Sequence, residues 1–420
     1  MDGNLMDGNL LVYNIGLLAT PEGSAPKSGK EQGEITQREN CHILVENGKI
    51  TEIGNNPPDL EQKFNNYEKL DAGGGLVTPG LVDSHTHLVF GGWRHGELGL
   101  KLAGATYLEI LAAGGGILNT VGKTRAASSE ELFEKSYGLL DECLSHGVTT
   151  LEAKSGYGLD VENEVKCLEV IKKLDSEHSI DVVSTFMGAH AVPKEHKASP
   201  EAYINLIRDK MLPFVAEKRL ARYCDVFCEK GTFSLDESRQ ILEKAKSLGL
   251  ELKAHAEEIN NLGGAVLAAE LGCVSAEHLI KIDDAGIKAM SKAGVVAVCL
   301  PCTSFYLNED FAPAREMINA GVPVAIATDF NPGSSPNLNL QLAMNMACYK
   351  YKMTPKEILT AVTLNAAAAI GQEAVAGSLE AGKLADILVW DSKELDYIFY
   401  RYGSNLVKTV VKRGNIIKRS

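Results

Sequence analysis

Thr78-Pro79-Gly80-Leu81-Val82-Asp83-Ser84-His85-Thr86-His87 is a short apolar run that ends in two histidines one residue apart. Because residues i and i+2 of a strand point the same way, His85 and His87 are predicted to lie side by side where a buried strand ends. Two imidazoles that converge in this way can bind one metal ion. A single His-x-His pair is a weak signal, so its meaning depends on what ends the other strands.

Seven further apolar, strand-like runs follow this stretch along the chain, near residues 148–153, 182–187, 223–228, 250–254, 274–277, 295–300 and 322–328. Most of the gaps between them carry a helical pattern, at residues 129–145, 161–174, 235–248, 282–293 and 312–320. Eight strands alternating with helices predict an α/β protein with a closed (β/α)8 TIM-like barrel. An open doubly wound sheet is the alternative. The first gap contains Gly114-Gly115-Gly116, which we interpret as a turn or flexible lid.

The two ends of the chain differ from its middle. Short strands are predicted at residues 10–18, 41–46 and 49–53 near one end, and at 385–390 and 407–412 near the other. Asn47-Gly48 and Arg413-Gly414 are turn signals within these regions. Neither end is a complete domain by itself. We therefore predict one small β-sandwich domain built from both termini, residues 1–77 and 378–420, beside a barrel that spans residues 78–377.

Composition excludes several classes of protein. The 420 residues carry a formal net charge of -13, and without a basic stripe this balance disfavours nucleic-acid binding. The sequence has no run of 18 or more apolar residues, so no membrane span is predicted. The acidic first ten residues do not resemble a secretory signal. Nine scattered cysteines favour a reduced, cytoplasmic compartment. The single C-x-x-C pair, Cys299 and Cys302, is interpreted as two small apolar residues.

The carboxyl ends of barrel strands form the mouth where active sites lie. Five of the ten histidines fall at predicted strand ends, and Asp329 ends the eighth strand; the histidines are His85, His87, His190, His255 and His278. Three imidazoles and one carboxylate suit one divalent ion and leave room for a water. We predict His85, His87, His255 and Asp329 as the metal ligands. His278, just outside them, and Asp329 are candidates for proton transfer.

Further polar residues near the predicted mouth are candidates for proton transfer or substrate binding. Glu258 lies three residues after His255, and its carboxylate faces the mouth if a helical turn starts there; the alternative is a first-turn carboxylate favoured by the helix dipole. Arg94 could clamp a substrate carboxylate through two parallel hydrogen bonds. Tyr157, between two glycines, can project into a pocket. Residues 331–335 offer amide and hydroxyl donors, or form a tight turn.

These motifs resemble the amidohydrolase superfamily over nearly the whole chain. The His-x-His pair with a distant His and Asp is shared across that superfamily. The segments VFGGWR at 89–94, KSGYG at 154–158 and DFNPGS at 329–334 resemble a narrower family within it, which opens the ring of 4-imidazolone-5-propanoate in histidine degradation. The most specific likeness lies in residues 78–97, 152–159, 184–193, 255–269 and 327–336.

The resemblance implies a (β/α)8 barrel, a β-sandwich from both termini, and one zinc or iron ion at the four predicted ligands. It implies hydrolysis of the ring C–N bond, a cyclic amide, to give N-formimidoyl-L-glutamate. Carried over by position, the residues that contact substrate would be Arg94, Tyr157, His190, Glu258, Asn331, Gly333 and Ser334. The catalytic residues would be Glu258, His278 and Asp329, and which of them is the general base stays open. A homodimer is expected from the likeness alone.

Three alternatives stay open at this point. A related heterocycle deaminase would use the same ligands and also a glutamate shortly after His255, so Glu258 does not discriminate. A non-catalytic scaffold on a retained barrel is disfavoured by the intact set of ligands. Many superfamily members hold two metals bridged by a modified lysine at the end of the fourth strand. This chain has Lys230 near that place, but the narrower family uses one ion.

Overall fold

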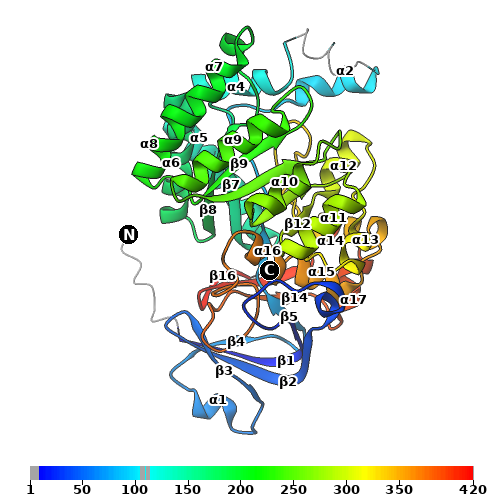
Figure 1. The fold of residues 1–420 in the computed structure, drawn as a ribbon. Helices are drawn as coiled ribbons and strands as arrows, with labels where there is room; N and C mark the ends of the chain where they lie inside the picture. Colours follow the sequence, from blue (N-terminus) through cyan, green and yellow to red (C-terminus); the bar gives the residue numbers. More distant parts are fainter. Residues whose placement is uncertain (1–8, 105–108, 110–113, 420) are drawn as a thin grey trace.

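The structure is a computed structural model that describes residues 9–104, 109 and 114–419, and it contains two eight-stranded sheets (Figure 1). Strands from both ends of the chain form the first, mixed sheet, in the order β16-β15-β14-β5-β1-β2-β3 with β4 beside β1. Its strands are β1 (Leu10–Thr20), β2 (Thr36–Glu46), β3 (Lys49–Asn55), β4 (Glu68–Asp71), β5 (Leu76–Pro79), β14 (Ile387–Trp390), β15 (Val407–Lys412) and β16 (Asn415–Arg419). The two termini meet where β5 pairs antiparallel with β14.

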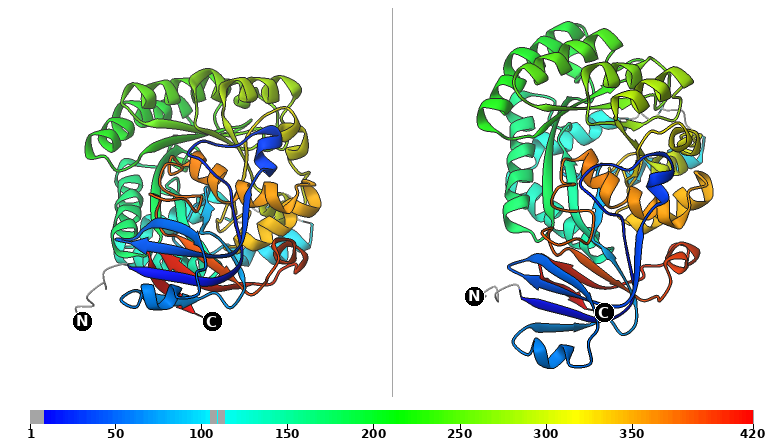
Figure 2. Two further views of the ribbon diagram at one scale, coloured as in Figure 1. Left: turned by 90° about the horizontal axis from the view of Figure 1, so that it is seen from below. Right: turned by 60° about the horizontal axis from the view of Figure 1, so that its bottom comes forward.

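Turn chemistry explains the hairpins of this sheet. Asn47 and Gly48 join β2 to β3, and both have positive φ angles, 52° and 74°. A two-residue hairpin turn of this kind favours asparagine followed by glycine because both positions need left-handed backbone. Figure 2 shows the strands of the two termini lying together beside the barrel. The predicted β-sandwich from both termini is confirmed as far as one mixed sheet to which both termini contribute, whereas its boundaries at residues 77 and 378 remain a prediction.

The second sheet is the predicted barrel. It runs in chain order from β6 to β13, and every strand is parallel to its neighbour. This sequential order excludes an open doubly wound sheet, in which the strand order reverses at a switch point. The strands are β6 (Leu81–Asp83), β7 (Val148–Lys154), β8 (Asp181–Ala189), β9 (Tyr223–Cys228), β10 (Glu251–Ala256), β11 (Ser275–His278), β12 (Val296–Cys299) and β13 (Val324–Ile326).

The barrel closes through the segments that follow its first and last strands. The main-chain N–H of Asp329 donates to the carbonyl of His85 at 3.0 Å, and that of His87 donates to the carbonyl of Phe330 at 2.8 Å. A parallel bridge joins Thr86 to Phe330. The closing seam therefore brings the His-x-His pair directly beside the aspartate that ends the eighth strand.

Helices surround the barrel strands (Figures 1 and 2). The predicted helix at 129–145 matches α5, which starts at a capping box between Ser128 and Glu131. Within the described residues the α-helices are α1 (Leu60–Lys63), α2 (Leu98–Leu102), α4 (Ile117–Ala126), α5 (Ser129–Ser145), α6 (Val161–Glu177), α7 (Pro200–Leu206), α8 (Leu212–Lys218), α9 (Leu235–Ser247), α10 (Gly264–Leu271), α11 (Asp284–Ala293), α12 (Pro301–Leu307), α13 (Ala314–Asn319), α14 (Leu340–Lys350), α15 (Pro355–Ala361), α16 (Leu364–Ala369) and α17 (Leu395–Tyr400). None of the described helices is long and apolar enough to cross a membrane.

Trp390 on β14 anchors the mixed sheet in the main apolar core, where it is 1% exposed. Its indole N–H donates to Thr78 Oγ1 on β5 at 2.8 Å. Trp390→Ala is expected to lower the free energy of unfolding by about 3–5 kcal/mol, because it leaves a large cavity. Urea denaturation measures this loss. Tyr400→Ala is the control, since Tyr400 is 76% exposed and its loss should cost no more than about 0.5 kcal/mol. Equal losses would contradict the core role of Trp390.

Candidate metal centre and active site

The four residues predicted as metal ligands converge at the carboxyl ends of the barrel strands. His85 and His87 follow β6, His255 lies in β10, and Asp329 follows β13. Asp329 Oδ1 lies 3.4 Å from His85 Nε2 and 3.6 Å from His87 Nε2. His255 Nε2 lies 3.4 Å from His87 Nε2. Four donor atoms from three strand ends thus face one another in a buried space.

The spacing of these donor atoms fits a divalent metal ion. At a metal–ligand distance of about 2.0–2.1 Å, ligands at the corners of a tetrahedron lie about 3.4 Å apart. The three separations between donor atoms, 3.4, 3.6 and 3.4 Å, agree with that value. Among the described residues His85 Nε2, although buried, has no hydrogen-bond partner. Burial, together with nearby positive groups, lowers the pKa of His85 and His87 well below the usual value, so both rings are in the neutral form that binds metals.

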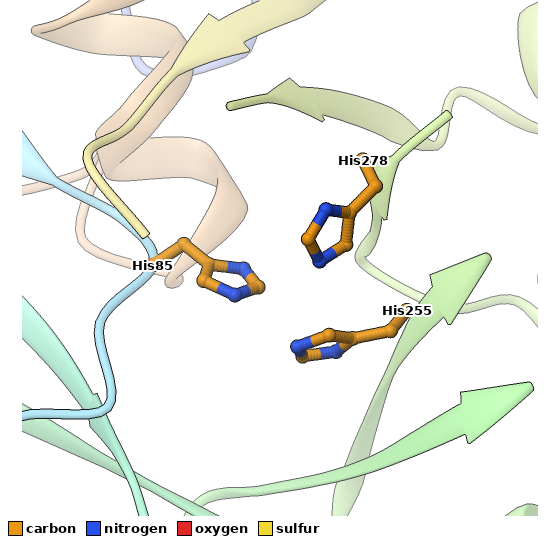
Figure 3. Close-up of side chains that lie close together, drawn as sticks. All are labelled: His85, His255 and His278. Atoms are coloured by element: carbon orange, nitrogen blue, oxygen red, sulfur yellow. The ribbon is translucent and has the colours of Figure 1, made fainter. Parts of the chain in front are cut away.

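His278 is the last residue of β11 and also points into the mouth. Alternation along a strand would send Glu277 and His278 to opposite faces. His278 has a φ of 68°, a left-handed conformation that interrupts the alternation, and both side chains are buried. One ring nitrogen from each of His85, His255 and His278 lies within 4.8 Å of the others. Figure 3 shows the three rings converging from separate elements.

Asp329 is held in place from two sides. Its Oδ2 accepts a hydrogen bond from Thr303 Oγ1 on α12 at 2.6 Å, while Oδ1 faces the histidines. Its φ is 52°, so it also adopts the left-handed conformation that non-glycine residues rarely adopt. Such backbone costs of order 1–3 kcal/mol and is concentrated at functional sites. The aspartate is therefore positioned at the expense of local strain.

Glu258 faces the mouth, although no helical turn starts beside it. Residues 257–260 form bends, and α10 begins only at Gly264, so Glu258 is not a first-turn helix carboxylate. The chain cannot turn helical at once because Glu257 adopts a φ of 51°. Glu258 Oε2 lies 3.6 Å from His278 Nε2, and its side chain is 13% exposed. Burial, with the nearby carboxylates of Asp329, Glu229 and Glu309, raises the pKa of Glu258 to about 8.

Two further predicted substrate residues line the same space. The ring of His190 stacks on that of His87, with centroids 4.8 Å apart and an interplanar angle of 17°. Its Nδ1 lies 3.1 Å from the carbonyl oxygen of Gly156, which fixes the ring. Tyr157 is 3% exposed and lies 5.3 Å from His190 and 5.9 Å from His87, ring to ring. These aromatic rings form one wall beside the metal centre.

Arg94 has a partner that the sequence did not indicate. Its Nε and Nη2 donate to the carboxylate of Glu97 at 2.9 and 3.0 Å. The Nη1 nitrogen approaches Gly333 so closely that a Cβ at that position would come within 2.1 Å of it. Glycine is therefore required at residue 333 for Arg94 to keep this position. The guanidinium is held in a fixed direction beside the loop that follows Asp329.

The loop at 331–334 is a tight turn. Asn331 Oδ1 accepts the main-chain N–H groups of Gly333 and Ser334, at 2.8 and 2.7 Å. Its Nδ2 donates to the carbonyl of Asp329 at 2.7 Å and to Ser334 Oγ at 2.9 Å. This turn was the alternative interpretation of the segment. Contacts of Asn331, Gly333 and Ser334 with substrate remain a prediction.

Several buried charged residues next to the ligands were missed by the sequence analysis. Glu277 Oε2 lies 2.5 Å from His85 Nδ1, and Asp225 Oδ2 lies 3.0 Å from His255 Nδ1. Lys154, Lys253 and Glu152 complete the same buried group. A signal in the sequence could have found Lys253. It precedes His255 by two residues in a strand, so both side chains point to the same side of β10.

Two motifs of the sequence play no part in the site. Lys230 lies on the turn after β9 and is exposed, so it does not face the metal centre. Cys299 and Cys302 are buried and free, and burial raises the pKa of the Cys302 thiol to about 12. Such a thiol carries almost no reactive thiolate at neutral pH. The interpretation of both cysteines as small apolar residues agrees with their burial.

The chain is similar to known proteins over nearly its whole length. The amidohydrolase family matches residues 76–417. An imidazolonepropionase from Alkaliphilus oremlandii is 50% identical over 415 residues, which cover 98% of either chain. One from Alkaliphilus metalliredigens is 48% identical over 412 residues, 97% of this chain and 98% of its own. One from Streptococcus pyogenes serotype M1 is 48% identical over 408 residues, 97% of either chain.

Solved structures share the fold at much lower identity. A zinc-bound adenosine deaminase from Xanthomonas campestris has a TM-score of 0.70 and 18% identity, over 97% of this chain and 92% of its own. Atrazine chlorohydrolase TrzN from Arthrobacter aurescens, in complex with zinc, has a TM-score of 0.72 and 18% identity, over 98% and 95%. At such identities the likeness concerns the barrel and its flanking sheet, and not the reaction.

Proposed function

The chain belongs to the amidohydrolase family and, within it, to the imidazolonepropionases, and from this premise we propose how its barrel mouth opens the ring of 4-imidazolone-5-propanoate. The enzyme is a hydrolase that acts on the C–N bond of a cyclic amide, and its product is N-formimidoyl-L-glutamate. The main structural support is that four donor atoms converge beside Glu258 and His278 at the mouth of the barrel.

A divalent ion belongs to this site, and we propose one ion, zinc or iron, held by His85, His87, His255 and Asp329. Both metals accept imidazole and carboxylate donors. When bound, the ion supplies Lewis-acid chemistry: it polarises a carbonyl oxygen and lowers the pKa of a water molecule. One carboxylate cancels only part of the charge of a divalent ion, so the site keeps a positive charge, which suits chemistry that develops negative charge on oxygen.

Glu258 and His278 move the protons. Water adds its oxygen to the ring carbonyl carbon, the C–N bond breaks, and the ring nitrogen gains a proton. His278, whose pKa burial holds well below its usual value, is neutral and accepts the proton from the attacking water. Glu258 is protonated at neutral pH and gives its proton to the departing nitrogen. The 3.6 Å gap between the two side chains lets the proton return to Glu258.

Arg94 and the aromatic wall orient the substrate. We place the propanoate carboxylate at the guanidinium of Arg94, with the imidazolone ring against Tyr157 and His190. The carboxylate of Glu97 holds the guanidinium in a fixed direction, so less freedom is lost when substrate binds. Asn331, Gly333 and Ser334 shape the loop on the same side.

A deaminase of the same superfamily is not favoured. Both activities need the metal ligands and a proton-carrying glutamate, so the catalytic groups alone do not separate them. Relatives at 48–50% identity over nearly the whole chain are imidazolonepropionases.

A cytoplasmic location also belongs to the proposal, and its support is that all nine cysteines are free thiols. The homodimer stays a prediction.

Conversion of freshly prepared 4-imidazolone-5-propanoate by the purified enzyme tests the function. We expect a product heavier than the substrate by one water, identified as N-formimidoyl-L-glutamate by mass spectrometry, with no ammonia released. In ¹⁸O-labelled water one labelled oxygen should enter the new carboxylate. Release of ammonia, or no conversion by metal-loaded enzyme, would contradict the proposed reaction.

Arg94→Ala is expected to raise KM by about 10- to 100-fold, since a hydrogen-bonded charged partner contributes roughly 1.5–3 kcal/mol. The change in kcat should be small because the guanidinium binds the part of the substrate that does not react. Steady-state kinetics measure both constants. Arg94→Lys should recover only part of the affinity, since lysine lacks the planar fork. Arg401→Ala, at an exposed arginine directly after α17, is the control. An unchanged KM for Arg94→Ala would remove Arg94 from this role.

A further inference from the structure

Five charged side chains form a layer inside the barrel, directly beneath the metal ligands. We call it the charged layer: Glu152 and Lys154 on β7, Asp225 on β9, Lys253 on β10 and Glu277 on β11. All five residues are 0% exposed. Branched apolar side chains usually fill the interior of a (β/α)8 barrel. Burying charges away from water costs free energy, and a protein with apolar residues of similar volume in their place is often equally stable. Packing alone therefore does not explain the charged layer.

Two carboxylates of the layer reach up to the ligands. Glu277 Oε2 contacts His85 Nδ1 at 2.5 Å, and Asp225 Oδ2 contacts His255 Nδ1 at 3.0 Å. A neutral imidazole carries one proton, and a carboxylate beside Nδ1 holds the proton on that nitrogen. The lone pair of Nε2 is then free, and Nε2 is the atom of each ring that faces the other donor atoms.

The two lysines hold these carboxylates from below. Lys154 Nζ lies 2.8 Å from Asp225 Oδ2, and Lys253 Nζ lies 3.5 Å from Glu277 Oε1. Lys253 also donates to the carbonyl of Ala369 at 3.0 Å, which anchors the layer on α16 at the far end of the barrel. Each carboxylate is thus fixed between an ammonium group and an imidazole.

Glu152 shares the layer but not the contact with histidine. Its carboxylate lies 2.8 Å from Lys154 Nζ and 3.2 Å from Lys253 Nζ, and it accepts a hydrogen bond from Thr185. In the described part of the chain no hydrogen bond or ion pair joins it to an imidazole. Glu152 therefore offers a matched control, with the same burial, the same charge and the same two lysines.

We propose that Glu277 and Asp225 are positioning residues of the metal centre, which fix the protons of His85 and His255 on Nδ1 and so direct Nε2 toward the ion. The two lysines and α16 keep the carboxylates in register. The inference rests on the metal centre of the proposed function and is independent of the substrate. His87 is held differently, by stacking on His190, and among the described residues no ion pair joins its Nδ1 to a carboxylate.

Zinc affinity of the full-length enzyme tests the proposal. Metal is removed by dialysis against a chelator, and zinc is titrated back in competition with a chromophoric chelator. Glu277→Gln and Asp225→Asn should weaken zinc binding by about 10- to 100-fold, the usual effect of removing such a partner. Glu152→Gln should stay within about threefold of the unmodified enzyme. In cobalt-loaded enzyme, the visible spectrum should change in the first two variants and not in the third.

The controls separate positioning from stability. Thermal unfolding of the metal-free proteins should show comparable losses for all three variants, because each breaks the buried charge pattern. If Glu152→Gln weakens zinc binding as much as Glu277→Gln, or if Glu277→Gln binds zinc normally, the positioning role is overturned. If the unmodified enzyme itself binds no zinc or iron, the proposed metal centre fails instead.

A milder pair of variants serves if the charge changes prevent folding. Ser275 Oγ donates to Glu277, and Thr185 Oγ1 donates to Glu152, each at 2.5 Å. Ser275→Ala should weaken zinc binding by about three- to tenfold, the equivalent of one hydrogen bond, while Thr185→Val should leave it unchanged. Equal effects of the two substitutions would overturn the proposal.

Discussion

Asp329→Ala is expected to remove the activity together with the metal. Asp329 supplies the one carboxylate of the donor set and lies 3.4 Å from His85 Nε2. Lewis-acid stabilisation of the transition state amounts to several kcal/mol, so we expect kcat/KM to fall by about 1,000-fold or more. Steady-state kinetics and metal analysis by mass spectrometry measure the two effects on the same preparation.

Asp329→Asn and a distant aspartate provide the comparison. Asparagine keeps the shape and can still accept the hydrogen bond from Thr303, but it lacks the charge that holds the ion. It should therefore retain less metal than the unmodified enzyme while it stays folded. Asp396→Ala, at an exposed position of α17, should leave activity and metal content unchanged. Full activity of Asp329→Ala, or full metal content without activity in the asparagine variant, would contradict the role of Asp329 as a ligand.

Glu258→Gln is expected to lower kcat by about 100- to 10,000-fold, the usual contribution of a positioned proton donor or acceptor. Glutamine fills the same space beside His278 but cannot release a proton to the departing ring nitrogen. Metal content should change little, because Glu258 is not among the predicted metal ligands, and the fall in kcat should exceed any change in KM. Steady-state kinetics, with metal analysis of the same protein, measure this separation of kcat from binding.

Glu257→Gln is the matched control for Glu258. The two residues are neighbours in the chain, but Glu257 turns away from the mouth and accepts the main-chain N–H groups of Gly264 and Ala265 at 2.6 and 2.8 Å. Its substitution should lower stability at the start of α10 and spare kcat. If Glu257→Gln lost as much activity as Glu258→Gln, the effect would be structural, and Glu258 would lose its catalytic assignment.

The fold could be predicted from the sequence because its signals are local and repeated. Apolar runs such as residues 148–153 and the capped helix at 129–145 are read one element at a time, and the order of strands and helices then limits the topology. The predicted ligands also converge as expected, because every one of them ends a strand of the same barrel. The structure adds why they meet, since the hydrogen bond from Asp329 to His85 closes the barrel.

The remaining features depend on contacts between distant residues or on single backbone angles. No helical turn starts at Glu258 because Glu257 adopts a positive φ, which residue type alone does not reveal. The pairing of Glu277 with His85 joins residues 192 positions apart. Glutamate and lysine within strands are read as exposed by default, so the charged layer becomes visible only once the barrel is closed around it.

Metal reconstitution shows whether activity depends on one metal ion per chain. Enzyme stripped by a chelator should convert no 4-imidazolone-5-propanoate, and zinc or iron added stepwise should restore activity in a straight line that ends at one ion per chain. The unmodified enzyme and the Asp329→Ala variant are titrated side by side, and only the first should recover. Full conversion by metal-free enzyme, or a requirement for two ions per chain, would contradict a single metal centre at His85, His87, His255 and Asp329.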